Sequence, residues 1–290
     1  MTSLAQAAPL VALARRARRP YATLAMTYVL LTVAALVTLI PFAWVFLGAF
    51  RSTDEIRSSP GQWIPAHPTF DNFIRLFRDN GFSVYLGNSL LVAAIMVAGN
   101  LLFASMVGYA LAKLQFTGKR LVFGAVMAAL MVPFAATFVP QFVVTVHLGL
   151  IDTLPGIALP TVVLPIAIFI MRQFAESIPD DLFEAARIDG AGEFRIFLRI
   201  FLPLTGPALA TQAILTFLFS WNSFIWPLIV AQSNSTYTLP VGLAAASQQV
   251  HTTDYGLLLA GAVVVMLPVL VLFLFLQKYF IHGIAATGLK

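Results

Sequence analysis

The chain has 290 residues, of which 60% are hydrophobic and only 10% are charged, and its mean hydropathy is +0.90. A soluble domain uses about 25% charged residues, so this composition excludes a water-soluble globular protein and makes the lipid bilayer the solvent. The absence of cysteine also excludes disulfides, thiol catalysis and cysteine-ligated metals.

The N-terminal half is expected to hold three membrane-spanning helices, because a span needs about 20 apolar residues. Residues 1–20 form a basic arm, and spans are expected at 21–50, 82–112 and 121–146. The apolar span at 21–50 is too long to be the apolar region of a secretory signal peptide. The segment 51–81 between the first two spans carries four basic and four acidic residues with several Pro and Gly, and it is expected to fold as an outer cap.

The C-terminal half predicts three further spans and one charged loop. The span at 153–171 contains Pro155, Pro160 and Pro165, each of which removes a backbone donor, so this helix is expected to be kinked. Residues 172–203 are densely charged. The last two spans, 203–230 and 255–276, are separated by a polar outer loop at 231–254. The fold class is therefore an all-α membrane protein with six transmembrane helices in a single domain, 21–290.

The distribution of Lys and Arg predicts the orientation. Of the 17 such residues, only Arg51, Arg57, Arg75 and Arg78 would lie outside if the N-terminus is cytoplasmic, which leaves 13 inside. Cytoplasmic segments of membrane proteins carry an excess of basic residues. Both termini are therefore expected in the cytoplasm, and the isoelectric point of about 9.7 needs no nucleic-acid partner to explain it.

Within the charged loop the sequence predicts a helical hairpin. Asp180 and Asp181 complement the positive N-terminal end of a first helix, and Gly190 and Gly192 allow the chain to reverse. A second helix carries four apolar residues on one side, at i, i+3, i+4 and i+7: Phe194, Phe197, Leu198 and Phe201. Charge pattern alone leaves open a solvated amphipathic connection.

The spacing of particular residues in this loop is a more specific signal than its charge pattern. Glu184-Ala185-Ala186 is followed by three residues, Gly190, nine residues, and Ile200-x-Leu202-Pro203. This pattern resembles the cytoplasmic loop of ATP-binding-cassette importer permeases. The whole chain is similar to the maltose-permease-G-like group of the carbohydrate-uptake branch, in segments such as Asn88-Ser89-Leu90, Leu150-Ile151-Asp152-Thr153, Trp221 to Pro227 and Thr238 to Leu243. The C-terminus departs from the group's Gly-Ala-x-Lys-Gly ending, so a tail contact with an ATPase does not follow.

The resemblance implies a bacterial inner-membrane permease subunit that is not itself an enzyme. No phosphate-binding Gly-x-x-x-x-Gly-Lys-[Ser/Thr] occurs in the chain, so ATP and Mg²⁺ are expected on a partner ATPase and no cofactor or metal on this chain. The expected partners are a second, maltose-permease-F-like permease, a dimer of P-loop ATPase subunits, an extracytoplasmic solute-binding protein and membrane lipid. The residues expected to couple to the ATPase are Glu184, Ala185, Ala186, Asp189, Gly190, Ile200, Leu202 and Pro203.

A sugar substrate would need aromatic platforms and amides along its path. The candidates on the span at 203–230 are Trp221, Asn222, Phe224 and Trp226, and those on the span at 82–112 are Asn88 and Tyr109. For Asn222 the alternative is hydrogen bonding between helices. For Trp226 the alternative is anchoring at the membrane interface.

Two other functional classes have less support. A secondary transporter driven by protons or sodium uses carboxylates within its spans, and none of the six predicted spans contains Asp or Glu. A membrane-embedded enzyme needs a catalytic constellation, but the four His are in no metal-ligand pairing and no Gly-x-Ser-x-Gly occurs.

Overall fold

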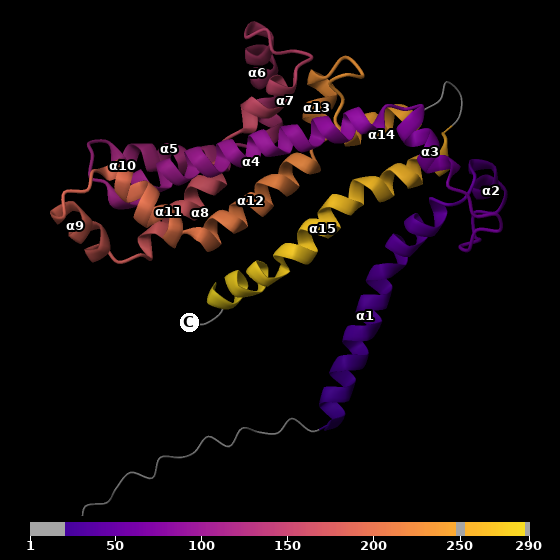
Figure 1. Ribbon diagram of the computed structural model, residues 1–290, viewed down its shortest axis with the longest axis horizontal. Coiled ribbons are helices and arrows are strands. Elements are labelled where there is room, and N and C mark those ends of the chain that lie inside the picture. Colours follow the sequence, from indigo (N-terminus) through magenta and orange to yellow (C-terminus); the bar gives the residue numbers. More distant parts are fainter. Residues whose placement is uncertain (1–20, 248–252, 288–290) are drawn as a thin grey trace, which may run out of the picture. The chain divides into compact units, whose positions relative to one another are not determined.

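The computed structural model describes residues 21–247 and 253–287, with side chains for 23–247 and 253–275. Every regular element in these ranges is a helix, as the composition predicts (Figure 1). The chain divides into two units, Met1–Trp44 and Val45–Lys290, which are described separately. The predicted basic arm at 1–20 and the C-terminal residues 288–290 lie outside the described residues.

The first unit contains most of α1 (Tyr21–Gly48), a 28-residue helix with Pro41 inside it. Its segment Thr23–Gly48 is long and apolar enough to cross a membrane. This helix corresponds to the span predicted at 21–50.

The second unit contains two further helices of membrane-spanning length within α4 (Phe82–Lys113) and α15 (Tyr255–Thr287). Three bent helix pairs complete the set. In the first pair, α5 (Lys119–Met131) meets α6 (Phe134–His147) at a bend of 106°. In the second, α7 (Leu154–Ala158) and η1 (Leu159–Thr161) meet α8 (Pro165–Glu176) at 45°. In the third, the segment Glu193–Leu204 meets α12 (Gly206–Trp221) at 79°. If each pair is one span, the described residues hold six candidate spans, the number predicted.

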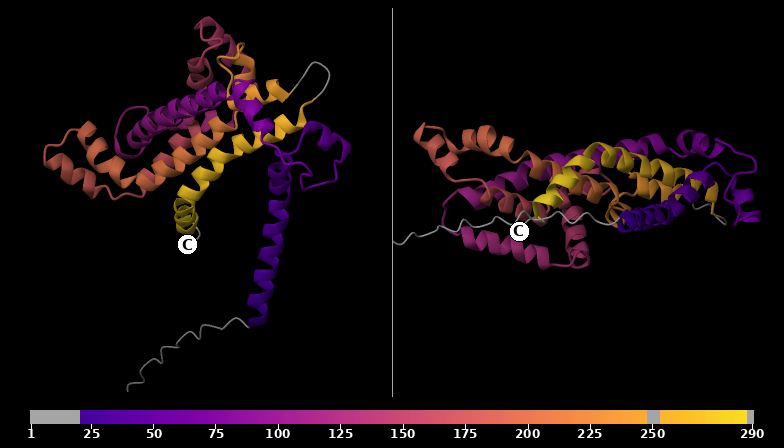
Figure 2. Two further views of the ribbon diagram at one scale, coloured as in Figure 1. Left: turned by 45° about the vertical axis from the view of Figure 1, so that its right-hand side comes forward. Right: turned by 90° about the horizontal axis from the view of Figure 1, so that it is seen from below.

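The span at 153–171 is bent, as its prolines predict, and two spans predicted without a break are also interrupted near a proline. The helix predicted at 121–146 is broken between α5 and α6, where Val132 is extended (φ −75°, ψ 120°), because a residue before proline disfavours the helical region. Figure 2 shows the sharp turn at this junction. The helix predicted at 203–230 ends at Trp221 and resumes as α13 (Ile225–Val230), since Pro227 cannot donate the bond that would continue it.

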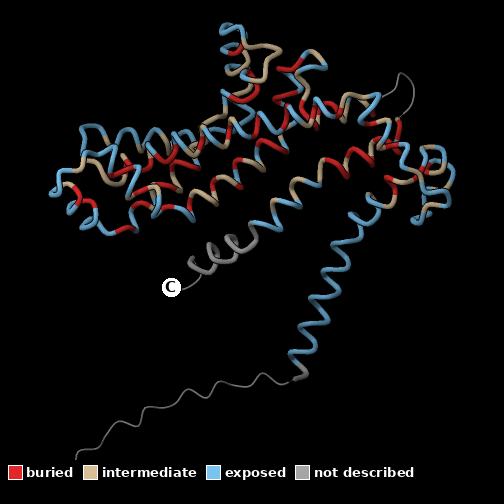
Figure 3. Tube along the Cα trace, viewed as in Figure 1, coloured by how far each residue is buried: buried red, intermediate tan, exposed pale blue. Residues whose placement is uncertain are grey.

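The core of the second unit lies where α4 packs along α8 and α12 (Figure 3). A Cβ atom on Gly108 would lie only 2.6 Å from Cβ of Met171, so glycine permits the close approach of α4 and α8. Asn100 is fully buried between the three helices. Its Oδ1 accepts from the Leu164 N–H at 3.0 Å, and its Nδ2 donates to Thr216 Oγ1 at 2.5 Å.

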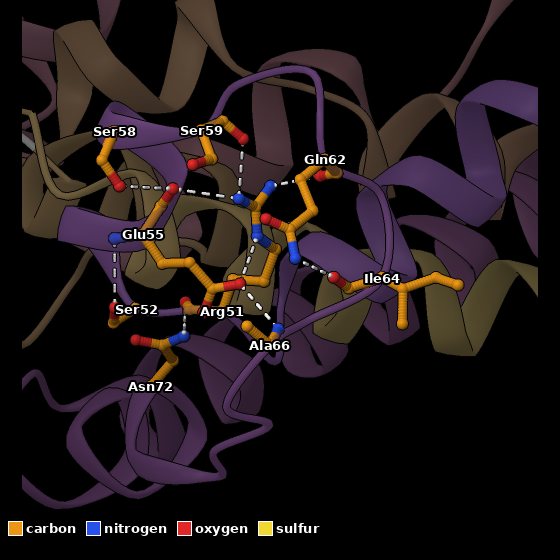
Figure 4. A network of polar contacts seen from close by, with 9 residues as sticks. All are labelled: Arg51, Ser52, Glu55, Ser58, Ser59, Gln62, Ile64, Ala66 and Asn72. Carbon is orange, nitrogen blue, oxygen red and sulfur yellow. Dashed lines mark hydrogen bonds and ion pairs between the residues drawn. The ribbon is translucent and has the colours of Figure 1, made fainter.

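The segment 51–81 folds around a buried arginine. Arg51 is 2% exposed, and its guanidinium donates to the Gln62, Glu55 and Ser59 carbonyl oxygens at 2.6, 2.9 and 2.8 Å (Figure 4). It also pairs with the Glu55 carboxylate at 3.2 Å. A buried charge is stable only when it is paired and hydrogen-bonded, so Arg51 organises α2 (Thr53–Ser58) and the loop that leads to α3 (Asp71–Arg78).

Candidate functional site

The predicted hairpin is confirmed, and a glycine makes its turn. Its first arm is α9 (Asp181–Ile188), and its second arm runs through α10 (Glu193–Ile196), the π-helical segment η2 (Phe197–Phe201) and α11 (Leu202–Leu204). Gly190 has φ +79°, a conformation that favours glycine, and Gly192 has the ordinary φ of −71°. The Ala191 N–H donates to the Ala186 oxygen at 2.9 Å and closes the turn.

The hairpin buries an aromatic core that differs in part from the predicted face. Phe197 and Phe201 are 4% and 0% exposed, whereas Phe194 and Leu198 are 67% and 45% exposed. Phe194 nevertheless stacks on Phe197 at 6.5 Å between ring centroids, and Phe197 stacks on Phe201 at 5.7 Å, so these rings follow one another along the arm. The predicted apolar side is therefore only partly buried, and Phe194 and Leu198 remain as apolar side chains on the hairpin surface.

The motif residues divide between this core and the surface. Ala186 is buried, and Ile200 and Leu202 are half-buried against the core cluster. The exposed members are Glu184, Ala185, Asp189, Gly190 and Pro203. Arg187, three residues after Glu184 in the same helix, pairs with Glu193 at 2.7 Å and not with Glu184. The Glu184 carboxylate has no ion pair with any side chain that the structure describes.

The C-terminal end of α4 contacts the hairpin. The Tyr109 hydroxyl donates to Glu193 Oε2 at 2.7 Å, and its ring packs in the hairpin core. One turn later, Lys113 Nζ donates to Asp180 Oδ1 at 2.5 Å, and this hydrogen bond lowers the pKa of the Asp180 carboxyl. Tyr109 therefore belongs to the hairpin contact and is not grouped with the other path candidates.

Three of the remaining path candidates make structural contacts. The Trp221 indole is 1% exposed and donates to the Val265 oxygen of α15 at 3.0 Å. The Trp226 indole is 3% exposed and donates to the Gly156 oxygen at 3.3 Å. The Asn88 amide donates to the Ser235 and Tyr237 oxygens at 2.8 and 2.9 Å, and so holds the outer loop on α4.

Asn222 and Phe224 differ from these three because both are exposed, at the break between α12 and α13. The Asn222 amide donates to the Leu218 oxygen of its own helix at 2.8 Å. This bond does not link two helices, so the structure gives no support to the alternative role of interhelical hydrogen bonding.

Asp152 is a structural residue to which the sequence analysis assigned no role. It adopts φ +56°, and its Oδ1 accepts from the backbone N–H groups of Gln232 and Ser233 at 2.8 and 3.0 Å and from the Thr236 hydroxyl. These hydrogen bonds, led by that of Thr236, lower the pKa of Asp152 to about 2. The carboxylate therefore fixes the start of the outer loop 231–254. Aspartate's tolerance of left-handed backbone is the one sequence signal that could have suggested a turn here.

Comparison with known proteins finds membrane transport proteins that are similar along most of the chain. Residues 100–286 match the family described as binding-protein-dependent transport system inner membrane component. The arabinooligosaccharides transport system permease protein AraQ of Halalkalibacterium halodurans is 42% identical over 259 residues, covering 88% of this chain and 92% of that protein. The diacetylchitobiose uptake system permease protein NgcG of Streptomyces coelicolor is 36% identical over 257 residues, covering 88% of this chain and 85% of that protein.

A solved structure has the same fold. A chain of a bacterial ABC transporter involved in the import of the acidic polysaccharide alginate matches with a TM-score of 0.80 and 26% sequence identity, over 90% of this chain and 97% of that chain. The match covers nearly the whole length of both chains, so this chain shares the overall fold of that transporter chain.

Proposed function

This chain belongs to the family of binding-protein-dependent transport system inner membrane components, and from that membership we propose that it is a permease subunit of an ATP-driven importer for oligosaccharides. The observation that carries the proposal is the hairpin, whose exposed Glu184 has no ion-pair partner among the described side chains. The substrate class rests on the two permease relatives, which serve transport of arabinooligosaccharides and diacetylchitobiose, and on the solved transporter, which imports alginate.

The hairpin is suited to dock in a groove of a nucleotide-binding partner. Its turn is closed by a hydrogen bond, its core is packed, and it exposes the acidic Glu184 together with apolar side chains such as Ile188 and Phe194. A short amphipathic helix that enters a groove buries this kind of surface. Glu184 would contact a basic group of the partner, which binds and hydrolyses ATP with Mg²⁺.

The basic residues support a cytoplasmic position for the hairpin and for both termini, because only four of the 17 Lys and Arg fall in the outer segments. In this orientation the cap at 51–81 and the loop at 231–254 face the outside. The complete importer would then contain this subunit, a second permease that supplies the other half of the path, two ATPase subunits and an extracytoplasmic binding protein.

Asn222 and Phe224 are the residues best placed to meet a sugar on this subunit. An exposed amide can donate to and accept from hydroxyl groups, and an exposed aromatic ring can stack on the apolar face of a pyranose. Trp221, Trp226 and Asn88 would shape the path indirectly through the contacts that fix α15, α7 and the outer loop.

The outer loop is proposed to contact the binding protein. Asp152 and Asn88 fix residues 232–237 from two sides, which presents Asn234 and Ser235 as exposed polar groups. A photo-crosslinker at Asn234 should capture the binding protein in at least one nucleotide state. Capture in no state would indicate a solvated connector.

Copurification tests the assignment. A tagged form of this chain should retain a P-loop ATPase after detergent extraction, and Glu184→Lys should weaken that retention. Asp79→Lys makes the same charge change in the outer cap and is the matched control, because Asp79 is exposed and only loosely paired with Arg78 at 3.9 Å. Retention of no ATPase by the wild-type chain would favour the secondary-transporter alternative.

A further inference from the structure

The contacts between α4 and the hairpin involve both arms of the hairpin. The Tyr109 ring lies 6.1 Å from the ring of Phe183 in the first arm, and 5.6 and 4.9 Å from those of Phe197 and Phe201 in the second, between centroids. Tyr109 is 4% exposed. One side chain of α4 is therefore the centre of the aromatic core that holds the two arms together.

Polar contacts reinforce this packing. Glu193 accepts from the Tyr109 hydroxyl through Oε2 and from Arg187 Nε through Oε1, both at 2.7 Å, so its carboxylate joins α4, α9 and α10. Lys113 Nζ donates to the Ile178 oxygen at 2.6 Å and to Asp180 at 2.5 Å, and it lies 5.0 Å from the Phe183 ring centre. The Lys113 side chain is 4% exposed, so this charge is shielded from water.

The direct covalent route from the hairpin into the membrane is bent. The second arm meets α12 at 79°, at Thr205, so a force along the arm is not transmitted along the axis of α12. In contrast, α4 is a continuous helix of 32 residues that packs along both α8 and α12. Packed cores move as rigid bodies more readily than they deform, so a helix fixed to the hairpin will follow it.

We propose that Tyr109, Lys113, Asp180, Arg187 and Glu193, here called the α4 clamp, make α4 the main route by which movement of the hairpin reaches the membrane-spanning helices. Tyr109 and Glu193 are its positioning residues. The clamp rests on the proposed function, because it needs an ATPase that moves the hairpin. None of its five residues is among the motif positions assigned to ATPase coupling, although Arg187 and Glu193 lie between them.

The test compares sugar moved per ATP hydrolysed in the complete complex reconstituted in proteoliposomes. Tyr109→Phe removes only the hydroxyl and keeps the ring in the aromatic core. Glu193→Gln keeps the side-chain size and removes the charge. The control is Glu176→Gln, which breaks the 2.5 Å pair with Arg172 inside the single helix α8 and therefore disconnects no two elements.

We expect Tyr109→Phe to lower the sugar moved per ATP about tenfold, the effect of losing a hydrogen bond to a charged acceptor, with assembly and ATP hydrolysis retained. The effects of the two changes should be less than additive in the double variant, because both weaken the same contact between Tyr109 and Glu193. Glu176→Gln should leave the ratio unchanged.

A ratio for Tyr109→Phe within about twofold of wild type would overturn the clamp. So would loss of coupling that only parallels loss of assembled complex, since the residue would then stabilise the fold alone. Each variant is compared with a wild-type complex that has been shown to transport sugar in the same assay. Failure of the wild type itself to import sugar with ATP would refute the proposed function instead.

Discussion

Replacing Gly190 tests whether the turn of the hairpin is needed for coupling. Gly190 has φ +79°, and a Cβ added there would meet no atom within 4 Å, so a substitution costs backbone strain and no steric clash. A left-handed residue other than glycine costs about 1–2 kcal/mol, whereas asparagine tolerates this region better. Strain should therefore rise in the order Gly190→Asn, Gly190→Ala, Gly190→Val.

Gly192 provides the matched control. It also has open space around its Cβ position, but its φ of −71° and ψ of 155° suit any L-residue. At equal membrane expression, Gly190→Val should reduce ATPase retention and uptake by about 5- to 30-fold, the population change that 1–2 kcal/mol produces. Gly192→Val should stay near wild type. Equal losses at the two glycines, or an asparagine variant as damaged as the valine variant, would show that backbone strain at Gly190 does not control the hairpin.

Three further outcomes follow from the other sites. Glu184→Lys should leave the protein in the membrane and abolish uptake, and normal uptake would remove Glu184 from the coupling surface. Asn222→Ala should lower uptake per assembled complex more than Asn222→Gln, by about fivefold or more for a lost hydrogen bond, while ATP hydrolysis is retained; unchanged normalised uptake would exclude Asn222 from the path. The pKa of Asp152 is lowered to about 2, so the stability that its carboxylate contributes is fully present above the ordinary aspartate pKa. This stability is lost as the pH falls through about 2. Asp152→Asn should therefore lower the melting temperature at neutral pH, and a melting temperature equal to that of wild type would contradict the role of the carboxylate.

The spans could be predicted because bilayer thickness fixes their length, and charge is excluded from them. Proline by itself does not predict where they break. Pro41, Pro140 and Pro268 lie inside helices that continue, whereas Pro133 stands at a bend of 106°. The difference depends on whether neighbouring helices and side chains satisfy the freed backbone groups, which the local sequence does not reveal.

The hairpin was predictable because its signals are local, namely acidic residues at a helix start and glycines at a turn. The role of Tyr109 was not predictable, because its partner Glu193 is 84 residues away in the sequence. The exposure of Phe194 and Leu198 was missed for a different reason. A period of 3.6 residues predicts which residues share one side of a helix, but it does not show how much of that side the rest of the chain covers.

The most direct measurement of the central claim is uptake of a labelled arabinooligosaccharide into proteoliposomes that contain this chain with its second permease, its ATPase and its binding protein. We expect accumulation that requires ATP inside and the binding protein outside, and that persists when ionophores collapse the proton and sodium gradients. Uptake that continues without the ATPase and stops when an ion gradient is collapsed would contradict the account, and would assign the chain to ion-coupled transport.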